Sequence, residues 1–296
     1  MHTIKHSKAD RAFFIGNDLF LIVAFLLVFF PVVYIVSSSF SDPSAVISGE
    51  VLLWPVRPSL EGYQAVFKYS TIVTGYLNSI FYTVVGSCIN IFMTVLAAYP
   101  LAQRNMKGRG ILMFLFTFTM IFNGGLIPNY LLMSKLNIIN TRWVMLLPAA
   151  ISVYNLIICK TFFSNSIPTE VYEAASIDGC NHFRTLWSIA LPLSKPILAV
   201  LLLYYAVSNW NAYFNAFIYL SDRSKFPLQI ILREILIRNT IDPTVVYDPQ
   251  LEAVKQGLGD LLKYALIVVS TLPFMIAYPF VSKHFIKGAL AGAVKG

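Results

Sequence analysis

Charged residues and cysteine are scarce in this sequence. Asp, Glu, Lys and Arg make up 12% of the 296 residues, whereas soluble domains carry roughly 25%. The three cysteines, Cys88, Cys159 and Cys180, have no spacing that suggests a pair, so no disulfide is predicted. The dipeptide Gly-Lys, which a P-loop for nucleotide phosphates requires, is absent. These absences argue against a charged soluble domain, a disulfide scaffold and a P-loop nucleotide-hydrolysing domain.

Long apolar runs take the place of the missing charge. The chain is 57% hydrophobic, and a helix needs about 20 apolar residues to cross the hydrocarbon core of a membrane. We therefore predict an all-α membrane protein with six transmembrane helices. Their expected bounds are about 19–41, 72–102, 110–132, 142–164, 196–220 and 261–281. Glycines and Pro128 loosen the third span, and short helices outside the spans are expected near 59–63 and over 228–238.

Basic residues indicate the orientation, because cytoplasmic loops of membrane proteins are enriched in Lys and Arg. With the N-terminus inside, the cytoplasmic segments hold twelve basic and five acidic residues, and the external segments hold ten and nine. We expect a cytoplasmic arm (1–18), a transmembrane domain (19–283) and a cytoplasmic tail (284–296). The first apolar run exceeds the core of a signal peptide, about 7–15 residues, so it is expected to remain as a span. No aromatic–basic pattern suggests nucleic-acid binding.

The longest cytoplasmic loop, residues 165–195, contains a short predicted helix. Thr169 can cap the start of this helix, and Gly179 can end it in a left-handed conformation. Ala174 and Ala175 are small, which would let the surface of a partner approach the backbone closely. The sequence therefore predicts a helix of two to three turns that is suited to docking.

This loop resembles the EAA loop of permease subunits in ABC importers. The resemblance rests on Glu173-Ala174-Ala175, Asp178-Gly179, Ile189, Leu191-Pro192 and Pro196. It implies the type I ABC importer permease fold, in which this coupling helix docks into a cleft on an ATPase subunit. The implied coupling residues are Glu173, Ala174, Ala175, Asp178 and Gly179. Cys180 stands where alanine is more usual, and an amphipathic helix on the lipid surface would explain the helix but not the whole spacing.

The resemblance also implies the partners. ATP and magnesium would be bound by a partner ATPase dimer, so this chain would be a non-catalytic subunit with no cofactor of its own. A homologous second permease subunit and an extracytoplasmic solute-binding protein would complete the importer. The complex would lie in the bacterial inner membrane, with both termini of this chain in the cytoplasm, and would work by alternating access.

Further residues resemble the carbohydrate (maltose-type) branch of these permeases. They lie at 127–132, 140–141, 147–148, 210–211 and in the tail 288–296. Residues 123–125 and 210–214 are similar to those of permeases for complex oligosaccharides, such as alginate or pectin fragments. The substrate implied by this resemblance is an oligosaccharide.

Polar and aromatic residues in the second and fifth spans are candidates for the sugar passage. Sugars present hydroxyl groups and flat apolar faces, which amides, hydroxyls and aromatic rings can bind. The candidates are Asn78, Tyr82, Tyr205, Asn209, Trp210, Asn211, Tyr213 and Asn215. The alternative is that these side chains hydrogen-bond between packed helices.

Three other functions remain open from the sequence. An ABC permease for a non-sugar solute would share the loop. An ion-coupled carrier is disfavoured because proton relays need ionisable groups within the bilayer, and the spans lack them. A membrane enzyme is disfavoured because no His or Cys cluster and no nucleophile–base arrangement is visible.

Overall fold

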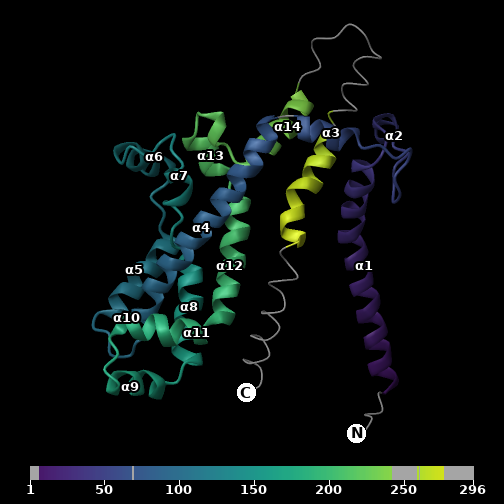
Figure 1. Cartoon of the computed structure of the whole chain (residues 1–296). Coiled ribbons are helices and arrows are strands. Elements are labelled where there is room, and N and C mark those ends of the chain that lie inside the picture. The colour runs from purple at the N-terminus through teal and green to yellow at the C-terminus, as the bar shows by residue number, and fades with distance from the viewer. Residues whose placement is uncertain (1–6, 69, 242–258, 260, 277–296) are drawn as a thin grey trace. The chain divides into compact units, whose positions relative to one another are not determined.

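The computed structural model describes residues 7–68, 70–241, 259 and 261–276 (Figure 1). Over these ranges the regular secondary structure is helical and contains no strand, so the all-α prediction is confirmed. The chain divides into two compact units. The first comprises residues 1–69 and 232–271, and the second comprises residues 70–231 and 272–296.

The first unit begins with the long helix α1, Lys8–Ser39. The Ser7 hydroxyl accepts from the Asp10 backbone N–H, and the Asp10 carboxylate accepts from the Ser7 N–H, which forms a capping box. Because this cap starts the helix at Lys8, residues 8–18 of the expected cytoplasmic arm are helical and continuous with the first expected span. Residues 1–6 lie outside the described part of the chain.

The remaining elements of the first unit are short. They are α2 (Pro43–Ile47), α3 (Glu61–Lys68) and a helix over Leu261–Ile276, which continues into the second unit and is yellow in Figure 1. Gly62 of α3 lies so close to the last helix that a Cβ there would be 2.9 Å from Leu261 Cγ. The helix expected near 59–63 is thus present as α3. Residues 277–281 of the sixth expected span and the expected tail, 284–296, lie outside the residues that the structure describes.

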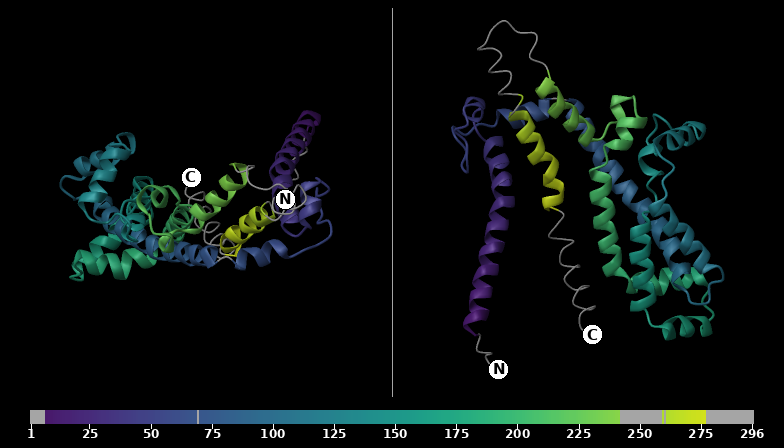
Figure 2. Two further views of the ribbon diagram at one scale, coloured as in Figure 1. Left: turned by 90° about the horizontal axis from the view of Figure 1, so that it is seen from above. Right: turned by 180° about the vertical axis from the view of Figure 1, so that it is seen from behind.

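Three helices build the centre of the second unit (Figure 2). They are α4 (Ser70–Ala102), α8 (Val153–Ser166) and α12 (Lys195–Trp210), and all three contact one another. Gly86 permits a close approach of α4 to α12 because glycine has no Cβ. A Cβ at this position would lie 2.8 Å from the side-chain amide nitrogen (Nδ2) of Asn209.

Several expected spans are interrupted. The third becomes α5 (Arg109–Ile121) and α6 (Leu126–Lys135), bent by 116°, because Gly125 takes a φ of 86°. The fourth is continuously helical only in α8, after α7 (Trp143–Leu146) and an irregular stretch that contains Pro148. The fifth ends with α12 at Trp210, and α13 (Phe214–Tyr219) follows separately. By length and composition, the described helices give two membrane spans, or up to four if each bent pair counts as one.

The other elements lie at the ends of these helices. They are α9 (Thr169–Ile177), α10 (His182–Thr185), the π-helix η1 (Leu186–Ala190), α11 (Leu191–Leu193), the 3₁₀ turn η2 (Arg223–Lys225) and α14 (Leu228–Ile241). The segment of α10, η1 and α11 meets α12 at an angle of 84°. The helix expected over 228–238 is present as the first part of α14.

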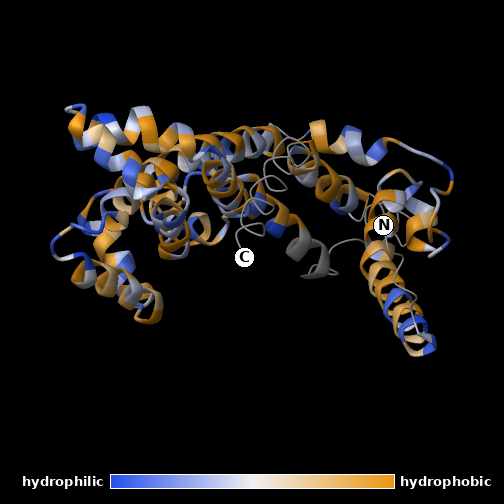
Figure 3. Cartoon of the chain, turned by 90° about the horizontal axis from the view of Figure 1, so that it is seen from below, coloured by the Kyte–Doolittle hydropathy of each residue, from blue (hydrophilic) through white to orange (hydrophobic). Residues whose placement is uncertain are grey.

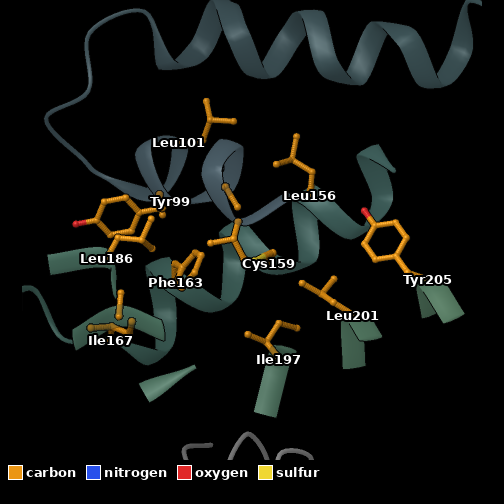
Figure 4. Close-up of a cluster of buried hydrophobic side chains, with 14 residues drawn as sticks. Tyr99, Leu101, Leu156, Cys159, Phe163, Ile167, Leu186, Ile197, Leu201 and Tyr205 are labelled. Carbon is orange, nitrogen blue, oxygen red and sulfur yellow. The ribbon is translucent and has the colours of Figure 1, made fainter. Parts of the chain in front are cut away.

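The described part of the second unit contains a large apolar core (Figure 4). Leu101 from α4, Phe163 from α8 and Leu201 from α12 are each at most 2% exposed and meet there. Much of the remaining helical surface is also apolar, as the hydropathy colours of Figure 3 show. Such a surface suits lipid, and helices in lipid associate by close packing and hydrogen bonds more than by exclusion of water.

Candidate coupling and transport site

The candidate coupling helix, α9, begins directly after Pro168. This proline occupies the cap position with φ −59° and ψ 146°, and no side chain caps the helix. Thr169 is already the first helical residue, so the expected Thr169 cap is wrong. Proline is well suited to this boundary, because its fixed φ fits a helix start and it has no N–H to satisfy.

The end of α9 is a tight, hydrogen-bonded exit. Gly179 takes the predicted left-handed conformation, with φ 72°. Its N–H donates to the Ser176 carbonyl at 3.1 Å, and the Cys180 N–H donates to the Ala175 carbonyl at 2.9 Å. These two bonds form a Schellman motif. Asp178, the C-cap residue of α9, precedes Gly179 and is exposed.

The two faces of α9 differ in accessibility. Glu173, Ala174 and Ile177 lie on one helical face and are all exposed, and Ile177 is 87% exposed. We call these three residues the coupling face. Ala175 is 3% exposed, so the close partner approach expected at this alanine is not available. Ile177 was missed from the sequence, although its spacing four residues after Glu173 could have indicated it.

Aromatic rings connect α9 to the central helices. The Tyr172 ring of α9 lies edge-on to Tyr99 of α4 at 6.2 Å, and Tyr99 lies edge-on to Phe163 of α8 at 6.1 Å. Burial raises the pKa of Tyr172 to about 12, so this residue is uncharged at neutral pH. A displacement of α9 would therefore act on α4 and α8 through packed, neutral side chains.

A polar cavity of about 530 Å³ separates α9 from the loops around it. Glu173 and Ser176 line it from α9, Arg104 lines it from the turn after α4, and His182 lines it from α10. Tyr99 and Tyr172 line this cavity as well, so the candidate coupling helix packs against α4 and borders open space on the same side.

A second cavity, of about 570 Å³, opens between α4, α8 and α12. We call it the central cleft. Its lining residues are Asn90, Ala149, Ile151, Ser152, Tyr154, Asn155, Leu203, Tyr204, Tyr205, Val207, Ser208 and Asn209. None of these twelve side chains is charged. The cleft offers amides, hydroxyls and tyrosine rings, and it includes two of the sequence candidates, Tyr205 and Asn209.

Tyr205 and Asn209 also hold the helices together. The Tyr205 hydroxyl is hydrogen-bonded to Thr94 Oγ1 at 2.6 Å and accepts from the Ser152 N–H at 3.1 Å. The Asn209 amide nitrogen donates to Asn90 Oδ1 at 2.9 Å. Both proposed explanations, helix association and cleft lining, thus apply to the same side chains.

Asn78 and Tyr82 bond to the segment around η2 and do not line the central cleft. The Asn78 amide nitrogen donates to the Ser224 and Phe226 carbonyls at 2.7 and 3.0 Å. The Tyr82 hydroxyl donates to the Lys225 carbonyl at 2.8 Å. Their geometry is that of structural anchors for the segment that follows α13.

The other four candidates are also outside the lining of the cleft. Trp210 is buried and lies edge-on to Tyr76 and Phe274, at 5.6 and 5.8 Å. Asn211 is exposed and donates to the Val207 carbonyl of its own helix at 2.9 Å. Tyr213 and Asn215 follow the break in this helix. Tyr213 is exposed, and Asn215 is half-buried. The expected cluster is divided because α12 ends at Trp210.

Residues 70–289 match the family described as binding-protein-dependent transport system inner membrane component. The chain belongs to this family of ABC permeases. Within the described ranges, no group of three or more His, Cys, Asp or Glu side chains could hold a metal ion. Membership of this family makes the permease a transport component and argues against the alternative of an ion-coupled carrier.

Relatives of this permease cover its full length. Protein LplC of Bacillus subtilis (strain 168) is 42% identical over 100% of this chain and 99% of its own. The polygalacturonan/rhamnogalacturonan transport system permease protein YtcP, from the same organism, is 41% identical over 95% of this chain and 99% of its own.

A solved structure shares the fold. It is the crystal structure of a bacterial ABC transporter involved in the import of the acidic polysaccharide alginate. One of its chains is 35% identical to this permease and superposes with a TM-score of 0.86, over 96% of this chain and 100% of that one. This likeness confirms the predicted type I ABC importer permease fold.

Proposed function

We propose that this permease passes an oligosaccharide through the central cleft by alternating access. The observation that carries the proposal is the lining of the cleft, which combines three tyrosines, three asparagines and two serines with no charged side chain. Small-molecule sites are mainly apolar and contain a few placed polar groups. Tyrosine rings suit the apolar faces of sugar rings, and the amides suit their hydroxyl groups.

Fragments of acidic polysaccharides are the first substrates to test. One similar permease is named for polygalacturonan and rhamnogalacturonan transport, and the similar solved structure is of an alginate importer. The lining of the central cleft shows no cation that would pair with a carboxylate. We therefore expect the permease to recognise ring faces and hydroxyls, and the solute-binding protein and the second permease subunit to contribute to the choice of sugar.

Removal of two exposed rings tests this role. Tyr154 and Tyr204 line the cleft, with ring centroids 6.4 Å apart, and are 57% and 39% exposed, so their loss leaves the buried hydrogen bonds intact. The double variant Tyr154→Ala/Tyr204→Ala should lower binding-protein-dependent uptake of labelled oligogalacturonides or alginate oligosaccharides at least tenfold. Leu202→Ala on α12, outside the cleft, is the matched control.

Assembly is measured alongside uptake in the same membranes. Normal uptake by the correctly assembled double variant would contradict the proposed passage. Uptake of a peptide or phosphate, with no uptake of any oligosaccharide, would favour the alternative of a non-sugar solute.

The coupling face supports docking to an ATPase dimer that binds ATP and magnesium. Ile177 presents a large apolar side chain to the outside, and Glu173 and Ala174 lie beside it. Central apolar anchors of this kind dominate many interfaces. Ile177→Asp should abolish co-purification of the ATPase or its transport-dependent stimulation, whereas the exposed Ser166→Ala should change neither. Equal ATPase stimulation in both variants would contradict docking at this face.

Membership of the family supports the proposal for the remaining partners and the topology. A homologous second permease would cover part of the apolar surface, and a solute-binding protein would meet the external segment that contains α14. Both termini would lie in the cytoplasm. The single-cysteine variants Ser7→Cys and Ser224→Cys, made after replacement of the three native cysteines, test this topology in right-side-out vesicles. A membrane-impermeant thiol reagent should label only the Ser224→Cys variant.

A further inference from the structure

A third cavity, of about 260 Å³, lies where α4, α5 and α8 meet the turn between α4 and α5. Its lining residues are Ala102, Arg104, Arg109, Lys160, Thr161, Ser164 and Asn165. Three of the seven are cations and three more are polar, whereas no acidic residue lines the cavity. It is separate from the central cleft and from the cavity beside α9, although Arg104 also borders the latter.

The three cations converge from different parts of the chain. Arg104 lies in the turn, Arg109 begins α5, and Lys160 lies in the middle of α8. Among the described residues, none of these three side chains has a hydrogen bond or an ion pair. Like charges gathered without a counter-ion repel one another, so the arrangement gains stability when an anion enters.

The wall of this cavity is held in place by the chain itself. The Ser164 hydroxyl donates to the Ala102 carbonyl at 3.3 Å, which joins the end of α8 to the end of α4. The helices α5 and α8, which carry most of the other lining residues, also contact each other. The three cations thus lie on, or directly beside, helices that contact one another.

The helix α5, which begins with Arg109, also carries exposed apolar side chains on the face opposite this arginine. Ile111, Phe114 and Leu115 follow Arg109 on this helix and are 69%, 67% and 52% exposed. A basic pocket at the start of a helix that also exposes apolar side chains matches a ligand that carries a negative head and hydrocarbon chains. Arginine guanidinium groups suit phosphate oxygens because they donate in a fixed fork.

We propose that this pocket binds the phosphate of an anionic membrane lipid. The phosphate would accept from Arg104, Arg109 and Lys160, the hydroxyl of Thr161 and the amide of Asn165 would complete its shell, and the acyl chains would lie along α5. The site would anchor the turn after α4, whose other side borders the coupling helix. This inference does not depend on the identity of the transported solute.

Native mass spectrometry of the assembled transporter tests the proposal with phosphatidylglycerol as the probe and phosphatidylcholine as its neutral counterpart. The triple variant Arg104→Gln/Arg109→Gln/Lys160→Gln should bind phosphatidylglycerol at least tenfold more weakly than the wild type. Lys107→Gln is the matched control, because Lys107 lies in the same turn but does not line the cavity. The control should change the affinity less than twofold.

Each other outcome would overturn the lipid assignment. Equal losses in the triple variant and the control would show a general charge effect. Displacement of phosphatidylglycerol by millimolar inorganic phosphate would assign the pocket to the free ion. Loss of the ATPase from the triple variant with unchanged lipid binding would assign these cations to a protein interface. Thermal unfolding of the same samples shows whether the triple variant is folded.

Discussion

The two longest helices, α1 and α4, are nearly equal in length but differ in what they contact. The most apolar 18-residue window of α1 has a mean hydropathy of 3.1 and no buried residue, whereas that of α4 has 1.9 and one third of its residues buried. In α4 the buried positions include Asn78, Tyr82 and Asn90, each hydrogen-bonded to another segment. Hydrophobicity therefore makes both helices suited to lipid. The polar and small residues of α4 additionally allow other helices to pack against it.

The largest expected difference comes from glycine replacement. Gly86→Leu in α4 should force α4 and α12 apart, because even a Cβ would lie 2.8 Å from Asn209. We expect a loss of about 1–3 kcal/mol in the free energy of unfolding and at least tenfold lower uptake. Gly16→Leu in α1 is the matched control, since a Cβ there has no neighbour within 4 Å. Thermal unfolding and uptake measure both variants, and similar losses would remove the contrast between the helices.

The next effect comes from the polar bridge at Asn90. This side chain donates to the Ala149 carbonyl at 2.6 Å and accepts from Asn209 at 2.9 Å. Asn90→Leu should lower the free energy of unfolding by about 1–2 kcal/mol, because it leaves buried partners unsatisfied. Unfolding of the purified complex measures this loss, with the exposed Asn211→Leu as a control of similar chemistry.

A double-mutant cycle with Asn209→Leu should show that the two losses are not additive. Strict additivity would mean that the bond seen between Asn90 and Asn209 does not couple the two helices.

A smaller effect is expected at the tyrosine hydroxyls. Tyr82→Phe in α4 removes the bond to the Lys225 carbonyl and should cost about 0.5–1 kcal/mol of the free energy of unfolding. Tyr34→Phe in α1 keeps the ring contact with Tyr264, at 5.8 Å, and should be near neutral. Parallel unfolding curves of the two variants make the comparison, and a larger loss at Tyr34 would contradict it.

The smallest effect is confined to the first turn of α1. Hydrogen bonds from Ser7 lower the pKa of Asp10 below its usual 3.8. The carboxylate therefore stabilises this turn fully above pH 3.8, and the contribution is lost as the pH falls through the lower, folded value. Asp10→Asn should remove this dependence. Hydrogen exchange of residues 8–12 against pH would show it, and identical profiles for wild type and variant would argue against the cap.

Pattern reasoning worked where one local rule decides the structure. Gly179 was expected to take a left-handed conformation, and it does so in a Schellman motif whose bonds involve only neighbouring residues. The start of the same helix was misjudged, because Pro168 and Thr169 both suit a helix boundary and the sequence does not say which one takes the cap.

Pattern reasoning was weaker where two distant segments compete for the same side chain. Asn78, Tyr82, Tyr205 and Asn209 all appeared as polar residues within apolar helices. Their division into anchors near η2 and lining of the central cleft depends on partners more than 50 residues away in sequence. The positions of helix breaks were also not predicted. The charge-free run 196–220, for example, contains nothing that requires the helix to end at Trp210.

By itself, the sequence determined that the chain is helical, suited to a membrane and equipped with the EAA loop, because these properties follow from hydrophobicity and from residues close together in the chain. Only the tertiary structure decided that Ala175 is buried while Ile177 is exposed, and that Arg104, Arg109 and Lys160 share one cavity. Burial and convergence depend on which surfaces the fold brings together, and a local pattern carries no information about surfaces that meet across the chain.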